Sequence, residues 1–346
     1  MTCEEFRALQ AAAADDPRPL IEAAFWITTK GLPGQPPLTR LVLNKPQQRV
    51  HGALMQMRAE ELPPREICLK ARQPGVSTLG LAELLATALC RPHSMSMLIA
   101  HVDEAAEKLF RRILFMVERL PPDLRPRMRP PRKDELYFEA MPCTDGDVDL
   151  KSSISVATAS GREVWRSQTL TSVLMSEYAQ FPYPEATLLG VMQSVAKAPS
   201  TLVLIESTAR GMGNSFHTQY VRAEAGESAF VAVFIPWFEC PDDTMPAPED
   251  FEPDDEERAL KRAYGLSNDR LQWRRYAIAT DCQGDIDRFN QEHPTTASGS
   301  FLATGLPAFD AQRLNLMYEK ARTREPERGE WTERGFIPMR KGRLAL

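Results

Sequence analysis

Between residues 67 and 235, short apolar runs alternate with longer segments in which apolar residues recur every three or four positions. The short runs have the length and apolar character of buried strands, and the longer segments have the period of amphipathic helices. The strands expected from this pattern are residues 67–69, 94–101, 136–139, 153–157, 169–175, 201–206 and 230–235. Helices are expected at residues 46–57, 79–89, 104–119 and 183–197. The alternation predicts an α/β fold, with a mostly parallel sheet flanked by helices and a ligand site outside the carboxyl ends of the strands.

The segments on either side of this core have a different character. Residues 1–40 predict a short helix followed by a connection rich in proline and glycine, which break regular structure. The elements expected after residue 240 are an acidic, proline-rich linker at 241–257, two or three short helices within 254–292, a helix at 307–322 and a possible strand at 335–338. We therefore divide the chain into an arm at 1–40, a core at 41–240, and a linker with a small helical subdomain at 241–346.

The composition, with 43% hydrophobic and 26% charged residues, is that of a soluble globular protein. No apolar run is long enough to span a membrane, and the N-terminus lacks the features of a secretion signal, so we expect a cytoplasmic protein. The six cysteines lack paired spacing, which indicates free thiols and excludes a disulfide framework or a zinc site. With a net charge of −5, any contact with nucleic acid must come from a local patch. The most basic segment, 120–133, is either a phosphate contact or a solvated loop.

The turn after the first core strand has the layout of a phosphate-binding loop. Pro74 and Gly75 form the turn, and the hydroxyl residues Ser77 and Thr78 precede the predicted helix. Backbone N–H groups at such a helix start point toward an anion, and glycine lets the backbone approach phosphates closely. A hydroxyl at this place is the kind of group that holds Mg²⁺.

The loop departs from the full G-x-x-x-x-G-K-[ST] pattern in two ways. Val76 stands where the lysine is expected, and the first glycine is missing. Two cations, Lys70 and Arg72, lie upstream instead. Alone, the segment therefore also fits an ordinary strand-to-helix turn of an α/β protein.

Polar groups also follow two other apolar strands of the core. Glu177 follows one of them, and a carboxylate there can orient or deprotonate water beside a phosphate, although the usual preceding aspartate is Ser176. Ser207 and Thr208 follow the other strand and suit a sensor of the γ-phosphate. Because the carboxyl ends of parallel strands meet at one edge of a sheet, we expect the clusters around Gly75, Glu177 and Ser207 to converge on one triphosphate.

This set of motifs resembles the large subunit of tailed-phage DNA-packaging terminases. The stretches similar to its deviant Walker A, its Walker B and its coupling motif are, in that order, Lys70-Ala71-Arg72-Gln73-Pro74-Gly75-Val76-Ser77-Thr78, Leu174-Met175-Ser176-Glu177-Tyr178-Ala179 and Glu206-Ser207-Thr208-Ala209-Arg210-Gly211-Met212-Gly213-Asn214-Ser215-Phe216. Pro46-Gln47-Gln48 resembles its adenine-reading segment, with Gln48 favoured because an amide both donates and accepts. Residues 293–305 resemble the link between its ATPase and nuclease parts. The likeness spans about residues 40–320.

The resemblance implies a P-loop ATPase of the strand-end-glutamate type, an ATP-hydrolysing motor subunit that translocates double-stranded DNA into a procapsid with ATP and Mg²⁺ as cofactors. The residues that would contact the nucleotide are Gln48, Lys70, Arg72, Gln73, Pro74, Gly75, Val76, Ser77, Thr78, Ser207 and Thr208. Ser77 and Glu177 would hold Mg²⁺, and Glu177 would also activate water. Arg72 would stabilise transition-state charge in cis, and Arg166 or Arg162 in trans from a neighbouring subunit. Such an arginine can be worth about 10³–10⁵ in rate, so a lone subunit is expected to be a poor ATPase.

The resemblance also implies partners and a location. The partners are double-stranded DNA, the portal protein, the terminase small subunit and further copies of the chain in a ring. The location is the host-cell cytoplasm and, transiently, the procapsid portal. Members of the family carry a C-terminal nuclease domain, and this chain ends where that domain would begin, so no nuclease activity is expected from it. A helicase-like ATPase and a catalytically weak nucleotide-binding assembly module remain alternatives.

Overall fold

The computed structural model describes residues 1–29, 36–160 and 169–302, together with 317, 320, 329–332 and 335–338. The chain divides into two compact units, Met1–Thr304 and Gly305–Leu346. The trans-arginine candidates Arg162 and Arg166 lie outside the described residues, as does almost all of the helix predicted at 307–322.

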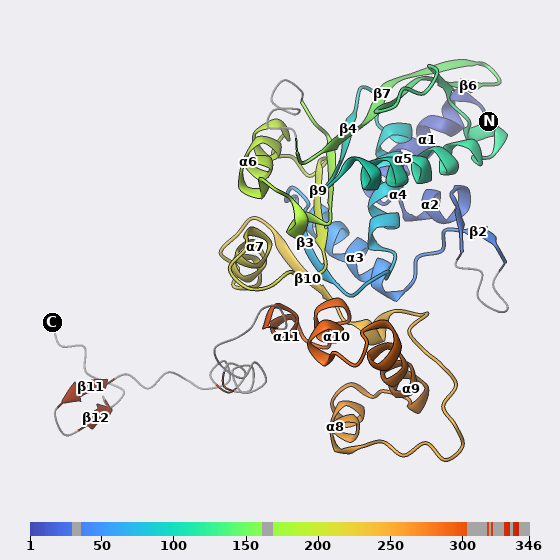
Figure 1. The fold of residues 1–346 in the computed structure, drawn as a ribbon. Coiled ribbons are helices and arrows are strands. Elements are labelled where there is room, and N and C mark those ends of the chain that lie inside the picture. The colour runs from blue at the N-terminus through green and yellow to red at the C-terminus, as the bar shows by residue number, and fades with distance from the viewer. Residues whose placement is uncertain are drawn as a thin grey trace. The chain divides into compact units, whose positions relative to one another are not determined.

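Within its described residues, the first unit is built on an eight-stranded sheet with the order β10-β3-β9-β8-β4-β7-β6-β5 (Figure 1). The strands are β3 (Arg65–Lys70), β4 (Met95–Ala100), β5 (Arg127–Met128), β6 (Glu135–Cys143), β7 (Gly146–Thr158), β8 (Ser172–Ser176), β9 (Leu202–Ser207) and β10 (Val231–Ile235). Neighbours from β10 to β7 pair in parallel, and only the β7–β6 and β6–β5 pairs are antiparallel. The predicted α/β fold with a mostly parallel sheet is confirmed.

Helices cover both faces of this sheet (Figure 1). One face carries α1 (Cys3–Asp15), α2 (Arg18–Ala24), α3 (Lys45–Ala59), α4 (Val76–Cys90) and α5 (Asp103–Glu118), and the other carries α6 (Pro184–Ser194) and α7 (Ser215–Glu224). Successive strand residues point to opposite faces, so Leu204 packs into the core under α4 while Ile205 packs into the core under α7. Helix α4 is apolar on nearly all sides and is accordingly buried. It lies directly on β8, because a Cβ on Gly80 would come within 2.8 Å of Leu174 Cδ1.

The predicted segmentation was wrong at two places. Strands β6 and β7 form one long antiparallel hairpin, where two short separate strands were expected. The first half of β7 was missed because it is not a continuous apolar run like the other strands. Its charged residues, such as Asp149, alternate with the buried Val148 and Leu150, and only this period of two marks it as a half-buried strand. The N-terminal arm also contains more structure than expected, since α2 and a two-stranded ribbon of β1 (Trp26–Thr28) and β2 (Leu38–Arg40) follow the first helix.

The basic segment 120–133 folds back on this hairpin. Its arginines make exposed ion pairs with the acids of β6 and β7. The pairs are Arg127–Asp147 at 2.5 Å, Arg129–Glu139 at 3.2 Å and Arg132–Glu135 at 3.8 Å. Much of the positive charge that a phosphate backbone would require is therefore offset locally, which favours the solvated-loop interpretation.

Short helices after β10 form a separate small core. They are α8 (Asp255–Tyr264), α9 (Asn268–Tyr276), a π-helical turn (Ala277–Asp281) and α10 (Ile286–Glu292), in agreement with the helices predicted within 254–292. The next helix, α11 (Ala297–Leu302), instead packs through Phe301 into the core under α7. Trp237 is fully buried in this core and stacks on Trp273 with ring centroids 5.2 Å apart. Ala71, one residue beyond β3, packs into the same core. The helices are thereby attached next to the end of β3.

The second unit, taken by itself, contains the antiparallel pair β11 (Gly329–Thr332) and β12 (Gly335–Pro338). The strand predicted at 335–338 is confirmed. All six cysteines are free thiols. A search of the described residues finds no helix that combines the length and apolar character needed to cross a membrane.

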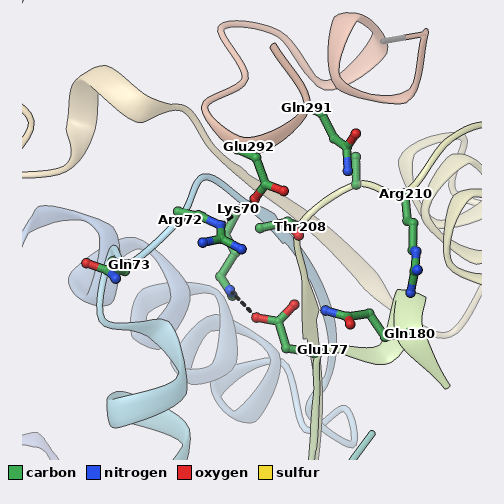
Figure 2. Close-up of a pocket in the computed structure, with 10 residues that line it drawn as sticks. Lys70, Arg72, Gln73, Glu177, Gln180, Thr208, Arg210, Gln291 and Glu292 are labelled. Carbon is green, nitrogen blue, oxygen red and sulfur yellow. Dashed lines mark hydrogen bonds and ion pairs between the residues drawn. The ribbon is translucent and has the colours of Figure 1, made fainter. Parts of the chain in front are cut away.

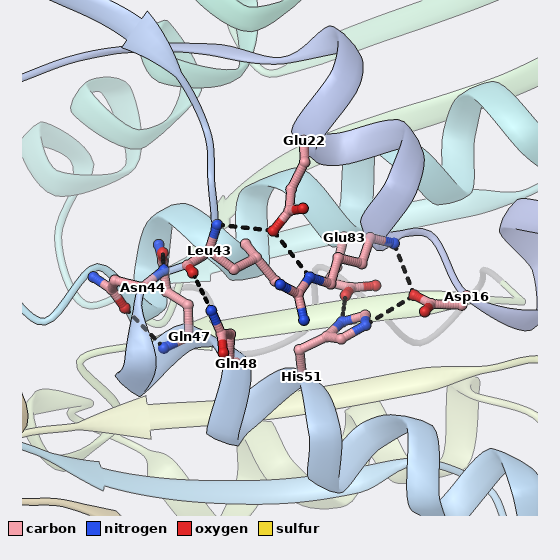
Figure 3. A network of polar contacts seen from close by, with 9 residues as sticks. Asp16, Glu22, Leu43, Asn44, Gln47, Gln48, His51 and Glu83 are labelled. Atoms are coloured by element: carbon pink, nitrogen blue, oxygen red, sulfur yellow. Dashed lines mark hydrogen bonds and ion pairs between the residues drawn. The ribbon is translucent and has the colours of Figure 1, made fainter.

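A polar network that is buried except at Asp16 fixes α3 against α4 and the end of α1 (Figure 3). His51 Nδ1 lies 2.8 Å from Glu83 Oε1, and His51 Nε2 lies 2.9 Å from Asp16 Oδ1. Burial opposes protonation of His51, but the hydrogen bonds and charges of Glu83 and Asp16 outweigh it and raise the pKa of His51. Glu66 of β3 adds a further buried acid near Glu83.

This network predicts a pH-dependent contribution to stability. A raised folded-state pKa stabilises the protein below the unfolded pKa of about 6.5, and the gain is lost as the pH rises through the folded value. Glu83→Gln, which keeps an acceptor but removes the charge, should therefore cost about 1.5–3 kcal/mol at pH 5.5 and clearly less at pH 9. Urea unfolding at the two pH values measures this, with the exposed Glu107→Gln as control. An equal loss at both pH values would contradict the assignment.

Candidate active site

The sheet order brings together the three strand ends that carry polar clusters. Strand β9 lies between β3 and β8, and all three run parallel. In the register, Glu206 is opposite Cys68 on one side and Ser176 on the other, and Ser207 is opposite Leu69. The side chains that follow these positions therefore meet at one edge of the sheet.

Lys70, the last residue of β3, is the buried cation of this edge. Its Nζ lies 3.0 Å from Glu177 Oε1 and 3.1 Å from Glu206 Oε2. Burial opposes the charge on Lys70, but the two carboxylates outweigh it and raise its pKa. Burial likewise opposes ionisation of Glu177, whose side chain is 26% exposed, but the Lys70 charge dominates and lowers the pKa of Glu177. At neutral pH the cluster therefore combines one ammonium with an ionised Glu177.

Glu206 joins this cluster from the central strand. Its side chain is fully buried, and its Oε1 accepts hydrogen bonds from Ser77 Oγ at 2.7 Å and from Ser176 Oγ at 2.6 Å. Lys70 approaches its Oε2, but that oxygen has no hydrogen-bond partner among the described residues. One carboxylate therefore connects the first turn of α4, the end of β8 and the end of β3.

The loop between β3 and α4 is held by the start of α3. Gly75 caps α4 in the left-handed region, at φ +88°. Gln47 Nε2 donates to the carbonyl of Gly75 at 2.9 Å, and Asn44 Nδ2 donates to that of Pro74 at 3.0 Å. Asn44 and Gln47 also form the capping box of α3 (Figure 3). The same side chains therefore fix both the helix start and the loop.

Any side chain at Gly75 is predicted to destabilise this loop. A Cβ there would lie 2.7 Å from Gln47 Nε2, and an L-residue in the left-handed region costs about 1–2 kcal/mol. Gly75→Ala should therefore lower the free energy of unfolding by at least this amount and displace the loop. Gly52→Ala in α3 is the matched control, because nothing lies within 4 Å of its Cβ and alanine favours a helix interior. Urea unfolding of the two variants should give opposite signs, and equal effects would argue against a tight loop.

A cavity of about 340 Å³ opens above the cluster (Figure 2). Its lining residues are Lys70, Arg72, Gln73, Glu177, Gln180, Thr208, Ala209, Arg210, Gln291 and Glu292. The last two belong to the end of α10, so the helical subdomain supplies one wall. Arg72 is 62% exposed; its Nε lies 2.5 Å from Glu292 Oε2, and its backbone N–H donates to the Glu292 carbonyl. Arg72 thus forms an ion pair with the end of α10.

The other predicted nucleotide contacts lie in different surroundings. Gln48 is exposed, its Nε2 donates to the Leu43 carbonyl at 2.6 Å, and it does not line the cavity. Ser207 is buried, and its Oγ accepts from the backbone of Ala179 at 3.2 Å, which ties the end of β9 to the segment after β8. In the first turn of α4, Val76 is buried and Thr78 is half-buried.

Glu206 was not predicted as a site residue. In the sequence it reads only as the polar end of an apolar strand, beside the hydroxyls of Ser207 and Thr208. The signal that could have found it is its position: a carboxylate at the end of a fully apolar run, on the same strand face as Leu204, is buried under α4. Gln180 and Arg210, which line the cavity after β8 and β9, were missed as well.

Comparisons with known proteins agree with this architecture. No protein-family model matches the chain, and no curated protein has a significantly similar sequence. Among solved structures, the large terminase of bacteriophage HK97 is similar with a TM-score of 0.54 and 16% identity, over 81% of this chain and 54% of the HK97 chain. The chain has the terminase ATPase fold. The resemblance inferred from the motifs is thus confirmed at the level of the fold, and the chain spans about half the length of the HK97 terminase.

Two further terminase structures were found. The large terminase ATPase domain of Thermus phage P74-26 matches with a TM-score of 0.49 and 18% identity, over 73% of this chain and 92% of that domain. The large terminase of a thermophilic bacteriophage, solved in complex with ATP-gamma-S, matches with a TM-score of 0.43 and 11% identity, over 64% of this chain and 50% of its own.

Proposed function

We propose that this chain is the ATP-hydrolysing motor part of a viral DNA-packaging terminase, which translocates double-stranded DNA into a procapsid. The observation that carries the proposal is the cluster of Lys70, Glu177 and Glu206 at three adjacent strand ends, beside a glycine-containing loop that opens α4. A buried cation, a helix start and an ionised strand-end carboxylate are the parts that phosphoryl transfer to water requires. The terminase ATPase fold supports the same function.

The residues present fit ATP with Mg²⁺. The start of α4 and Lys70 offer donors and positive charge for the phosphates. Oxygen ligands are what Mg²⁺ prefers, and Ser77, Glu177 and Glu206 bring hydroxyl and carboxylate oxygens to one place. Of these, Ser77 and Glu177 would contact the ion. Bound Mg²⁺ would neutralise the charge that develops on the β- and γ-phosphates.

Within this mechanism Glu177 acts on water. Its lowered pKa keeps it ionised at neutral pH, so it can orient a water molecule and accept its proton. Thr208 lines the cavity and would sense the γ-phosphate together with Ser207, whose bond to Ala179 passes a movement to the segment after β8. Gln48 would read the adenine. Arg72 could reach a phosphate in cis only after its ion pair with Glu292 breaks, which would couple nucleotide binding to the helical subdomain.

The remaining proposals concern assembly. Arg166, or Arg162, would act in trans, so that full turnover needs a ring of copies. The partners would be double-stranded DNA, the portal protein and the small subunit, in the host-cell cytoplasm and at the procapsid portal. The three parts at residues 1–40, 41–240 and 241–346 would be an arm, the ATPase core and a helical lid that leads toward a nuclease domain.

The test is ATP turnover by the purified chain with and without double-stranded DNA. The proposal expects Mg²⁺-dependent ATP binding, weak basal hydrolysis and an increase with DNA. Strand separation of a partial duplex would indicate a helicase-like ATPase instead. ATP binding with no turnover under any DNA condition would indicate an assembly module, and no ATP binding at all would overturn the proposal.

A further inference from the structure

A serine occupies a position where ATPases of this kind use an acid. In P-loop ATPases the loop hydroxyl and an aspartate at the end of a neighbouring strand together hold Mg²⁺. The loop hydroxyl here is Ser77, but the residue before Glu177 is Ser176. A serine hydroxyl brings no negative charge, so the position before Glu177 supplies no acid to the proposed site.

The neighbouring strand supplies a carboxylate at the same place. Glu206 of β9 is the register partner of Ser176, and both side chains point to the face covered by α4. The longer side chain of Glu206 reaches across, so that Ser176 Oγ lies 2.6 Å from its Oε1. The same Oε1 lies 2.7 Å from Ser77 Oγ. The hydroxyl of Ser176 thus donates to the Glu206 carboxylate, which lies beside the position that an aspartate side chain at residue 176 would occupy.

We propose, resting on the function proposed above, that Glu206 replaces the missing strand-end aspartate as the positioning residue for Mg²⁺. By accepting the hydroxyl hydrogen of Ser77, Glu206 leaves the lone pairs of that oxygen free for the cation. The buried carboxylate of Glu206 also raises the affinity of the site beside Ser77 for a divalent ion. In this proposal the carboxylate beside Ser77 is carried by β9 instead of β8, and Ser176 is its hydrogen-bond partner.

A simpler role must be separated from this one. Glu206 also faces Lys70 at 3.1 Å, so it could serve only as a buried counter-ion. A counter-ion role predicts an effect on stability and on ATP binding that is independent of Mg²⁺. A positioning role predicts a change in the Mg²⁺ concentration at which ATP binding reaches its midpoint.

The first experiment measures binding of a fluorescent ATP analogue by the whole chain as Mg²⁺ is titrated. Glu206→Gln should raise the Mg²⁺ midpoint by about 10–100-fold, the usual cost of losing such a partner of a metal ligand. Glu66→Gln is the matched control, because Glu66 is also a fully buried acid of the central sheet, but its carboxylate has no hydrogen-bond partner among the described residues. The control midpoint should equal that of the wild type. An unchanged midpoint in Glu206→Gln overturns the inference but leaves the proposed function standing, whereas wild-type protein that binds no analogue with Mg²⁺ overturns both.

The second experiment moves the acid back to β8. In the double variant Ser176→Asp/Glu206→Ser, the Mg²⁺ midpoint of analogue binding should return close to the wild-type value. This variant also tests the positioning role of Glu206 if Glu206→Gln does not fold. A folded double variant that still needs the higher Mg²⁺ concentration argues against the replacement. In a double-mutant cycle, Glu206→Gln should add little to Ser77→Ala, because Glu206 acts through the hydroxyl that Ser77→Ala has already removed. Fully additive effects would show that Glu206 does not act through Ser77.

Discussion

Replacing Glu177 by glutamine is expected to lower kcat for ATP hydrolysis by about 10²–10⁴-fold, the usual contribution of a positioned general base. Glutamine has the same shape but cannot take a proton from water. Lys70 would keep one carboxylate partner, Glu206, so the cluster should stay folded. Nucleotide affinity should consequently change far less than turnover.

Steady-state hydrolysis and binding of a fluorescent ATP analogue measure the two effects separately. Glu185→Gln is the matched control, since Glu185 is exposed at the start of α6 and does not line the cavity. Its kcat should equal that of the wild type. Wild-type turnover in Glu177→Gln would remove Glu177 from the mechanism and indicate that another group activates water.

The sheet edge could be predicted from the sequence because strands and helices alternate with clear periods. Apolar strands such as 201–206 and the following polar groups lie where the pattern placed them. Once a parallel sheet is inferred, the polar groups must share its carboxyl edge, and Lys70 and Glu177 accordingly meet at 3.0 Å.

The parts that escaped prediction depend on which elements are neighbours. The burial of Glu206 follows from the position of β9 between β3 and β8, and the sequence does not state that order. The ion pair of Arg72 with Glu292 likewise joins residues that are far apart in the chain. The two adjacent glutamines differ for a local reason: Gln47 is the third helical residue of α3 and closes its capping box, while Gln48 is exposed. The hydrophobic period alone therefore does not show which of the two glutamines lies against the loop.

Lys70→Ala is expected to have the largest effect on the folded state. Removing the ammonium leaves the carboxylates of Glu177 and the fully buried Glu206 close together without a counter-charge. Loss of one partner from a buried ion pair costs about 3–5 kcal/mol, because an uncompensated charge remains in the interior. Binding of ATP should also weaken, since the phosphates lose their buried cation.

Stability and binding can be separated with a second substitution. Adding Glu206→Gln to Lys70→Ala removes the uncompensated buried charge, so the double variant should regain much of the lost free energy of unfolding, while ATP binding should stay weak. Urea unfolding and the fluorescent analogue measure the two quantities, and the exposed Lys108→Ala, which should change stability by no more than about 0.5 kcal/mol, is the control. If the double variant regained ATP binding together with stability, Lys70 would be a structural counter-ion, and the phosphates would have to be neutralised by another cation of the cavity, such as Arg210.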